Sequence, residues 1–217
     1  LSKKWKSEFP LKTIQLKINN SPFCSFFLMK LIIFYHTGKE QAISDLKNIL
    51  VDKYKTLSIE KVMELLTQDG KISLKKSLKN KVISIDDMVM NDEYYITMMD
   101  LITIVIHYKI PMLLISGTTF KENNEPLIVF NNKTEKDEKV KHFFIVKPDS
   151  IKKETIPTYR LLRLEGEKEE FKIQNNRFSE KLQKQVFDKK YVLNKDDYYV
   201  LMKKKVKKMK KRLALKR

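Results

Sequence analysis

The stretch from Thr97 to Ile115, TMMDLITIVIHYKIPMLLI, decides the fold class. Apolar residues recur at helical spacing over 98–106, and Thr97 with Asp100 resembles a capping arrangement at the start of a helix. A proline then ends the helix, and the apolar run 112–115 is typical of a buried strand. A helix followed at once by a buried strand predicts a chain that mixes both kinds of element.

The rest of the chain repeats these signals. We expect a short strand within 11–18 and helices at about 23–35, 39–55, 58–69 and 85–90. Further strands are expected at 126–130, 142–146 and 159–164, and further helices after Ser179 and from Tyr198 onward. The pattern predicts an α+β (mixed α/β) fold in which helices precede a small sheet. We expect one domain at 1–165 and a polar, Lys-rich helical extension at 166–217.

Composition narrows the class of protein. The chain has 217 residues, 42% of them hydrophobic and 33% charged, which is typical of a globular protein. A single cysteine excludes an internal disulfide and favours a reducing compartment, such as the cytoplasm of a cell, or a virion if the protein is viral. We expect no signal peptide and no transmembrane segment, since the apolar run 23–35 is too short to span a bilayer. The first residue is Leu1, so the chain is either trimmed or one product of a larger polypeptide.

Positive charge gathers at the C-terminus. The net charge is +18, and residues 203–217 (KKKVKKMKKRLALKR) contain ten basic and no acidic residues, which leaves +8 on residues 1–202. Such a segment favours nucleic acid or another polyanion as partner. The candidate nucleic-acid-binding residues are Lys203, Lys204, Lys205, Lys207, Lys208, Lys210, Lys211 and Arg212.

Two other interpretations of this segment stay open. Met202, Val206, Met209 and Leu213 form an apolar stripe at helical spacing, which is typical of a helix that lies on an anionic membrane or in a partner's groove. The other interpretation is that the segment is a solvated terminus without a specific role.

Candidate catalytic residues are few. Cys24 follows the turn 19–22 and opens a helix, where unpaired N–H groups stabilise a thiolate, although a free cysteine is also commonly a small buried hydrophobe. A nucleophilic cysteine needs an imidazole, and His142 starts a strand directly after a charged loop. His36 and His107 sit near the ends of helices. One cysteine and three scattered histidines predict no metal site, and the chain has no phosphate-binding glycine motif, so we expect no cofactor.

Three stretches follow one another in a characteristic order: Ser21-Pro22-Phe23-Cys24-Ser25-Phe26, the run from Asp100 through His107-Tyr108-Lys109-Ile110-Pro111 to Ile115, and His142-Phe143. This order resembles the ovarian-tumour (OTU) family of papain-like cysteine peptidases, which usually remove ubiquitin. The stretch from Tyr94-Tyr95-Ile96-Thr97 through Ser116, with Tyr159-Arg160-Leu161, also resembles OTU-like segments in large proteins of big DNA viruses. The resemblance covers about residues 11–165.

The resemblance implies a peptidase site. Cys24 would be the nucleophile and His142 the general base, with ubiquitin or an acidic protein as partner. The family's aspartate three residues before the cysteine is replaced by Ser21, and Phe144 stands where some members carry an orienting Asn or Asp. The candidate orienting residues are therefore Asn19, Asn20 and Asp149. The alternative from another class is a non-enzymatic basic protein that binds nucleic acid, or scaffolds a virion, through its Lys-rich C-terminal helix.

Overall fold

The computed structural model describes residues 1–9, 13–17, 21–120, 125–131, 142–148, 157–164, 171–188 and 190–193. The N-terminal half is mostly helical: α1 (Lys3–Glu8), β1 (Thr13–Lys17), α2 (Pro22–Thr37), α3 (Ile43–Lys55), α4 (Ile59–Gln68), α5 (Ile72–Lys79), α6 (Ile85–Met90) and α7 (Met98–His107). The C-terminal half supplies most strands: β2 (Met112–Ile115), β3 (Leu127–Phe130), β4 (His142–Pro148), β5 (Tyr159–Leu164), β6 (Ile173–Gln174), the 3-10 turn η1 (Asn175–Arg177) and α8 (Glu180–Gln185).

The strands form one mixed sheet in the order β1-β5-β4-β2-β3, and the short strand β6 pairs with the start of β4. The pair β2 and β4 is parallel, with Met112 opposite Phe144, whereas the other neighbouring strands are antiparallel. Because β2 and β4 are parallel, both strands start at the same end of the sheet, and this direction fixes where His142 lies.

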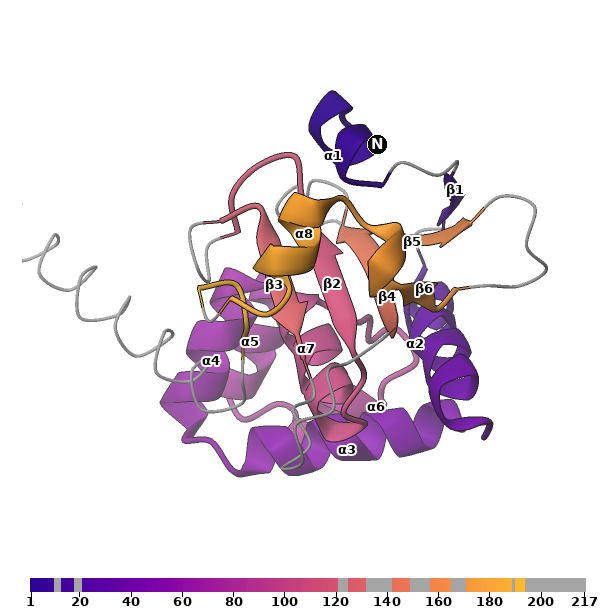
Figure 1. The fold of residues 1–217 in the computed structure, drawn as a ribbon. Helices are drawn as coiled ribbons and strands as arrows, with labels where there is room; N and C mark the ends of the chain where they lie inside the picture. The colour runs from indigo at the N-terminus through magenta and orange to yellow at the C-terminus, as the bar shows by residue number, and fades with distance from the viewer. Residues whose placement is uncertain are drawn as a thin grey trace, which may run out of the picture.

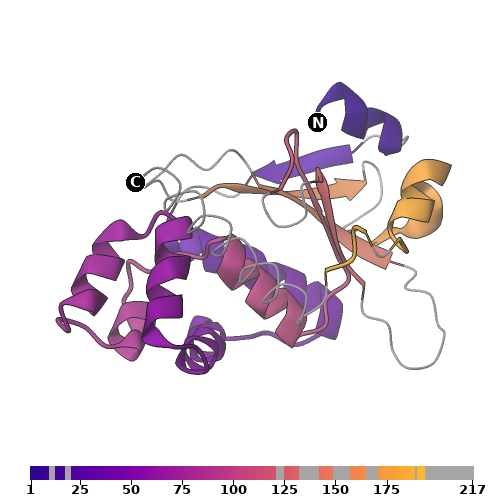
Figure 2. The same ribbon diagram turned by 90° about the vertical axis from the view of Figure 1, so that its left-hand side faces the viewer.

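Alternating residues of the central strands face two separate apolar cores, because successive side chains of a strand point to opposite faces. Leu114, Phe144 and Val146 pack against the large helical layer, while Leu113 and Ile145 pack against the opposite layer of α1 and α8. Figures 1 and 2 show the resulting three layers, with α2–α7 on one side of the sheet and α1 and α8 on the other. Since both faces are covered, the central strands are continuous apolar runs in the sequence.

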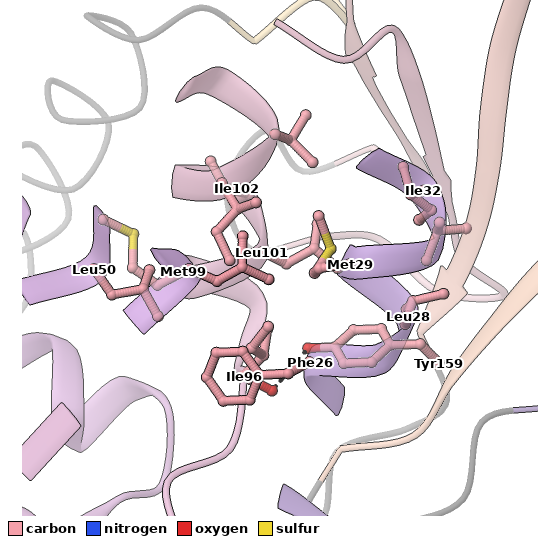
Figure 3. Close-up of a cluster of buried hydrophobic side chains, with 14 of the residues drawn as sticks. Phe26, Leu28, Met29, Ile32, Leu50, Ile96, Met99, Leu101, Ile102 and Tyr159 are labelled. Atoms are coloured by element: carbon pink, nitrogen blue, oxygen red, sulfur yellow. Dashed lines mark hydrogen bonds between the residues drawn. The ribbon is translucent and has the colours of Figure 1, made fainter. Parts of the chain in front are cut away.

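Helix α2 links the helical layer to the sheet. Its residues Phe26, Leu28, Met29 and Ile32 are almost fully buried and meet α3, α7 and β5. Figure 3 shows this cluster, with the Tyr159 ring of β5 lying across α2 toward Ile96. The helix is apolar on most sides, which is typical of a helix inside a core.

The predicted fold class is confirmed: the chain is α+β. The helix expected at 85–90 is α6, the strand expected within 11–18 is β1, and α5 is a helix that the sequence patterns did not predict. Sequence patterns gave no sign of α1 or β6, which are too short for periodicity to be detected.

Described residues on the C-terminal side of the expected boundary at 165 pack against the sheet. Phe178, Leu182 and Val186 are buried against the α1 face of the sheet, and Ile173 pairs with Phe143 of β4. The described residues beyond 165 therefore belong to the same core and cover this face of the sheet together with Trp5 and Phe9. The predicted helix from Tyr198 onward lies outside the described residues.

Candidate functional site

The backbone of Cys24 lies in the first turn of α2, as expected. Ser25, the residue after Cys24, holds the N-terminal end of α2 in place. Its buried hydroxyl donates to Pro22 O (2.7 Å) and accepts from the N–H of Ile96 (3.0 Å). The first turn of α2 therefore lies beside the segment that leads into α7.

His142 is the first residue of β4, and its side chain is exposed. It pairs with Gln174 of β6, and two residues later the Phe144 N–H donates to Pro111 O (3.0 Å) at the entrance of β2. The start of β4 therefore lies beside the C-terminal end of α7, whereas the first turn of α2 lies beside its N-terminal end.

Two contacts show that α2 and β4 run in opposite directions. The C-terminal end of β4 is the end near the first turn of α2, because Pro148 pairs with Tyr159 and the Tyr159 hydroxyl donates to Ile96 O (3.4 Å). The last turns of α2 lie near the start of β4, because the Tyr35 ring packs on Phe171 (centroids 5.0 Å apart), two residues before β6.

The structure therefore places the backbones of Cys24 and His142 near opposite ends of α2 and does not bring them together. The eleven residues of helix between Cys24 and Tyr35 span about 16 Å, and His142 belongs to the Tyr35 end. The physical reason is the parallel pairing of β4 with β2, which directs the start of β4 away from the first turn of α2. Asn19, Asn20, Asp149 and the basic residues of 203–217 lie outside the described residues, and so does the side chain of Cys24.

A buried ionic cluster, which sequence reasoning missed, lies between α3, α5 and α7. We define it as Tyr54, Lys71, Tyr94, Thr97 and Asp100. The Lys71 ammonium is 3.0 Å from the Asp100 carboxylate, and the two side chains are 1% and 0% exposed. The same carboxylate accepts hydrogen bonds from the hydroxyls of Tyr54 (2.7 Å) and Tyr94 (3.0 Å) and from the N–H of Thr97 (3.0 Å).

The cluster satisfies its own charges. Burial, and next the charge of Asp100, raise the pKa of Tyr54 and Tyr94 well above their usual range, so both hydroxyls stay protonated and donate to the carboxylate. Lys71 also lies over the Tyr94 ring, 3.6 Å from its centroid, and 5.1 Å from that of Tyr95. A buried pair with this many partners is a structural anchor that holds the start of α5 against α7.

Beside the cluster, the surface has a hollow of about 560 Å³ between α5 and the segment joining α6 to α7. Its lining mixes aromatic, aliphatic and polar side chains, which is common in ligand pockets. The lining residues are Gly70, Lys71, Ile72, Ser73, Leu74, Lys76, Met88, Asn91, Glu93, Tyr94 and Tyr95.

The helix along this hollow is rich in lysine. Lys75 and Lys76 lie in its middle and Lys79 at its end, and the stretch 70–85 contains no acidic residue. Within the described parts of the chain, none of these three lysines forms an ion pair. The run KISLKK was visible in the sequence, but only the fold places it beside a hollow.

Neither a metal site nor a membrane span is found where the structure describes the chain. No group of three or more His, Cys, Asp or Glu side chains is arranged to hold a metal ion there. Among the same residues, no helix has the length and apolar character needed to cross a bilayer.

His36, which the sequence places at the end of α2, has a pKa lowered by burial and then by the charge of Lys172.

Comparison with known proteins adds no relative: no family model, no curated protein and no solved structure matches the chain.

Proposed function

We propose that this protein binds nucleic acid without catalysing a reaction, through the Lys-rich segment 203–217. The observation that carries the proposal is the density of charge in that segment, where ten of fifteen residues are basic and none is acidic. Each lysine or arginine that meets a phosphate releases condensed counterions, so such a segment supplies affinity that depends little on base sequence. The cytoplasm, or a virion in the case of a viral protein, is the setting that fits this partner and a single free cysteine.

The alternative, an OTU-like peptidase, has less support from geometry. It requires an imidazole beside the thiol of Cys24, and the direction of β4 carries His142 to the far end of α2. The buried ionic cluster supplies no replacement base, because its carboxylate is fully buried and already paired with Lys71. A binding function requires no such arrangement.

Salt dependence tests the proposal directly. In the full chain, replacing the ten basic residues of 203–217 by glutamine should flatten the plot of log affinity for a single-stranded oligonucleotide against log salt concentration. The slope should change by about 0.7 for each phosphate that the protein no longer neutralises. Fluorescence anisotropy over a salt series measures both slopes.

A scrambled segment of the same composition is the matched control. It keeps all ten charges but destroys the stripe of Met202, Val206, Met209 and Leu213. Counterion release predicts an unchanged slope for the scrambled protein. If the glutamine variant keeps the original slope, the segment is not the binding site and the proposal fails.

A further inference from the structure

A second basic surface lies on the folded core, along α5. Lys75 and Lys76 stand four and three residues before Lys79, so each is a neighbour of Lys79 on the surface of the helix. Lys76 and Lys79 are exposed, and Lys75 is partly buried next to the buried Leu78. These lysines have no carboxylate to neutralise them among the described residues.

The hollow beside these lysines adds an aromatic surface. Tyr95 is partly exposed and lines the hollow, and Lys76 lines it too, so one side chain belongs to both the basic row and the hollow. The Lys71 ammonium lies 5.1 Å from the centroid of the Tyr95 ring, and the buried ionic cluster holds Lys71 in place. A fixed, half-exposed ring is suited to stacking, because little conformational entropy remains to be lost on binding.

The rim of the hollow carries groups that suit the edge of a base. The Asn91 side-chain oxygen accepts from the N–H of Glu93 (2.8 Å), which orients the amide and leaves its nitrogen as a donor. The Glu93 carboxylate is an acceptor of the kind that takes hydrogen bonds from exocyclic amino groups. The amino group of a base placed in the hollow could donate a hydrogen bond to this carboxylate.

We propose that single-stranded nucleic acid binds along α5, with phosphates on Lys75, Lys76 and Lys79 and one base in the hollow against Tyr95. The class of partner rests on the proposed function, but the residues are different ones. Proteins that bind single strands combine a basic track with aromatic rings in this way, since every base has a π-face.

The lysine row is tested in the full chain with the triple variant Lys75→Gln, Lys76→Gln, Lys79→Gln. The matched control is Lys3→Gln, Lys4→Gln, Lys6→Gln, which removes the same charge from α1, on the opposite side of the sheet (Figure 1). With a labelled oligonucleotide of about 12 nucleotides, the α5 variant should lower the salt slope by about 2, and the α1 variant should lower it by less than half as much. Equal effects of the two triples would mean that only net charge matters and would overturn the proposal.

The aromatic part is tested with Tyr95→Ala and Tyr95→Phe, using inorganic polyphosphate as a polyanion without bases. Tyr95→Ala should weaken oligonucleotide binding about tenfold and leave polyphosphate binding unchanged, while Tyr95→Phe should keep both. Equal loss for both polyanions, or no loss for either, would overturn the base-stacking role. If thermal melting shows that Tyr95→Ala does not fold, Tyr95→Leu repeats the comparison with an aliphatic side chain.

The glutamine variant of 203–217 separates this inference from the proposed function. If that variant still binds the oligonucleotide weakly and Tyr95→Ala then removes the remainder, both ideas hold. If binding is lost entirely with the segment, the α5 site fails alone. An unchanged slope for the segment variant, together with a loss in the α5 variant, would overturn the proposed function and keep the α5 site.

Discussion

At the scale of single residues, Lys71 and Asp100 are the most constrained pair in the described structure. Neither side chain reaches water, so each charge depends on the other and on the hydroxyls of Tyr54 and Tyr94. Forming such a pair gains little overall, because desolvation offsets the attraction. Breaking it is costly, because one charge is left buried without a partner.

The variant Lys71→Met tests this asymmetry. It leaves the Asp100 carboxylate without its cation, so we expect the free energy of unfolding to fall by about 3–5 kcal/mol. Lys55→Met is the matched control, because Lys55 pairs with Asp86 at 2.7 Å but both side chains are about half exposed. The control should change stability by less than about 1 kcal/mol. Urea unfolding measures both values, and similar losses would contradict the role given to burial.

Tyr159 makes the stability of the fold depend on pH. Burial, and then the charges of Asp69 and Asp100, raise the pKa of Tyr159 well above its usual value of 10.0. The folded protein therefore keeps this proton when the unfolded chain has lost it, so Tyr159 stabilises the fold fully below about pH 10. That contribution is lost as the pH rises from there toward the raised folded-state pKa, by up to about 1.4 kcal/mol per pH unit.

Tyr159→Phe removes this titration. Relative to the variant, the wild-type protein should keep a constant stability up to about pH 10 and lose stability above it, by up to about 1.4 kcal/mol per pH unit, measured by urea unfolding at each pH. At about pH 7 the two proteins should differ only by the hydrogen bond of the hydroxyl to Ile96 O. Parallel stability curves over this range would show that Tyr159 does not titrate with unfolding.

At the scale of elements, the direction of β4 determines how far His142 lies from the first turn of α2. Sequence reasoning located α2 and β4 within a few residues, because a buried helix and an apolar strand have clear periodicities. It could not tell that β4 pairs in parallel with β2, since strand direction depends on contacts between segments about thirty residues apart. The pairing of Cys24 with His142 depended on that direction.

A ubiquitin probe with a C-terminal electrophile tests this conclusion. We expect no labelling of Cys24 in the folded protein, because His142 lies at the other end of α2 and cannot take the proton of the thiol. A small thiol reagent, applied to folded and to urea-unfolded protein, is the control that Cys24 is intact. Labelling by the probe that Cys24→Ala and His142→Ala both abolish would restore the peptidase hypothesis.

At the scale of the whole molecule, composition and periodicity were sufficient to predict an α+β fold. They were insufficient to predict the buried ionic cluster, and they did not show that the lysines of α5 lie beside a hollow. Lys71 sits in a Lys-rich run that looks like a solvated face, and nothing local distinguishes this buried lysine from its exposed neighbours. Asp100 looked like a helix-capping residue, which it is, but its partners come from α3 and from the segments before α5 and α7.

The pairing of β1 with β5 has a consequence for how the chain is made. Thr13 pairs with Leu164, so β1 leaves the ribosome about 150 residues before its partner strand β5 has been synthesised. At about 5–20 residues per second this delay lasts about 10–30 s. The helices from α2 to α7 contact one another locally and can collapse during that interval, but β1 remains an unpaired edge that other nascent chains can reach. Fast translation or a bound chaperone would shorten or cover that exposure, so the yield of soluble protein should depend on both.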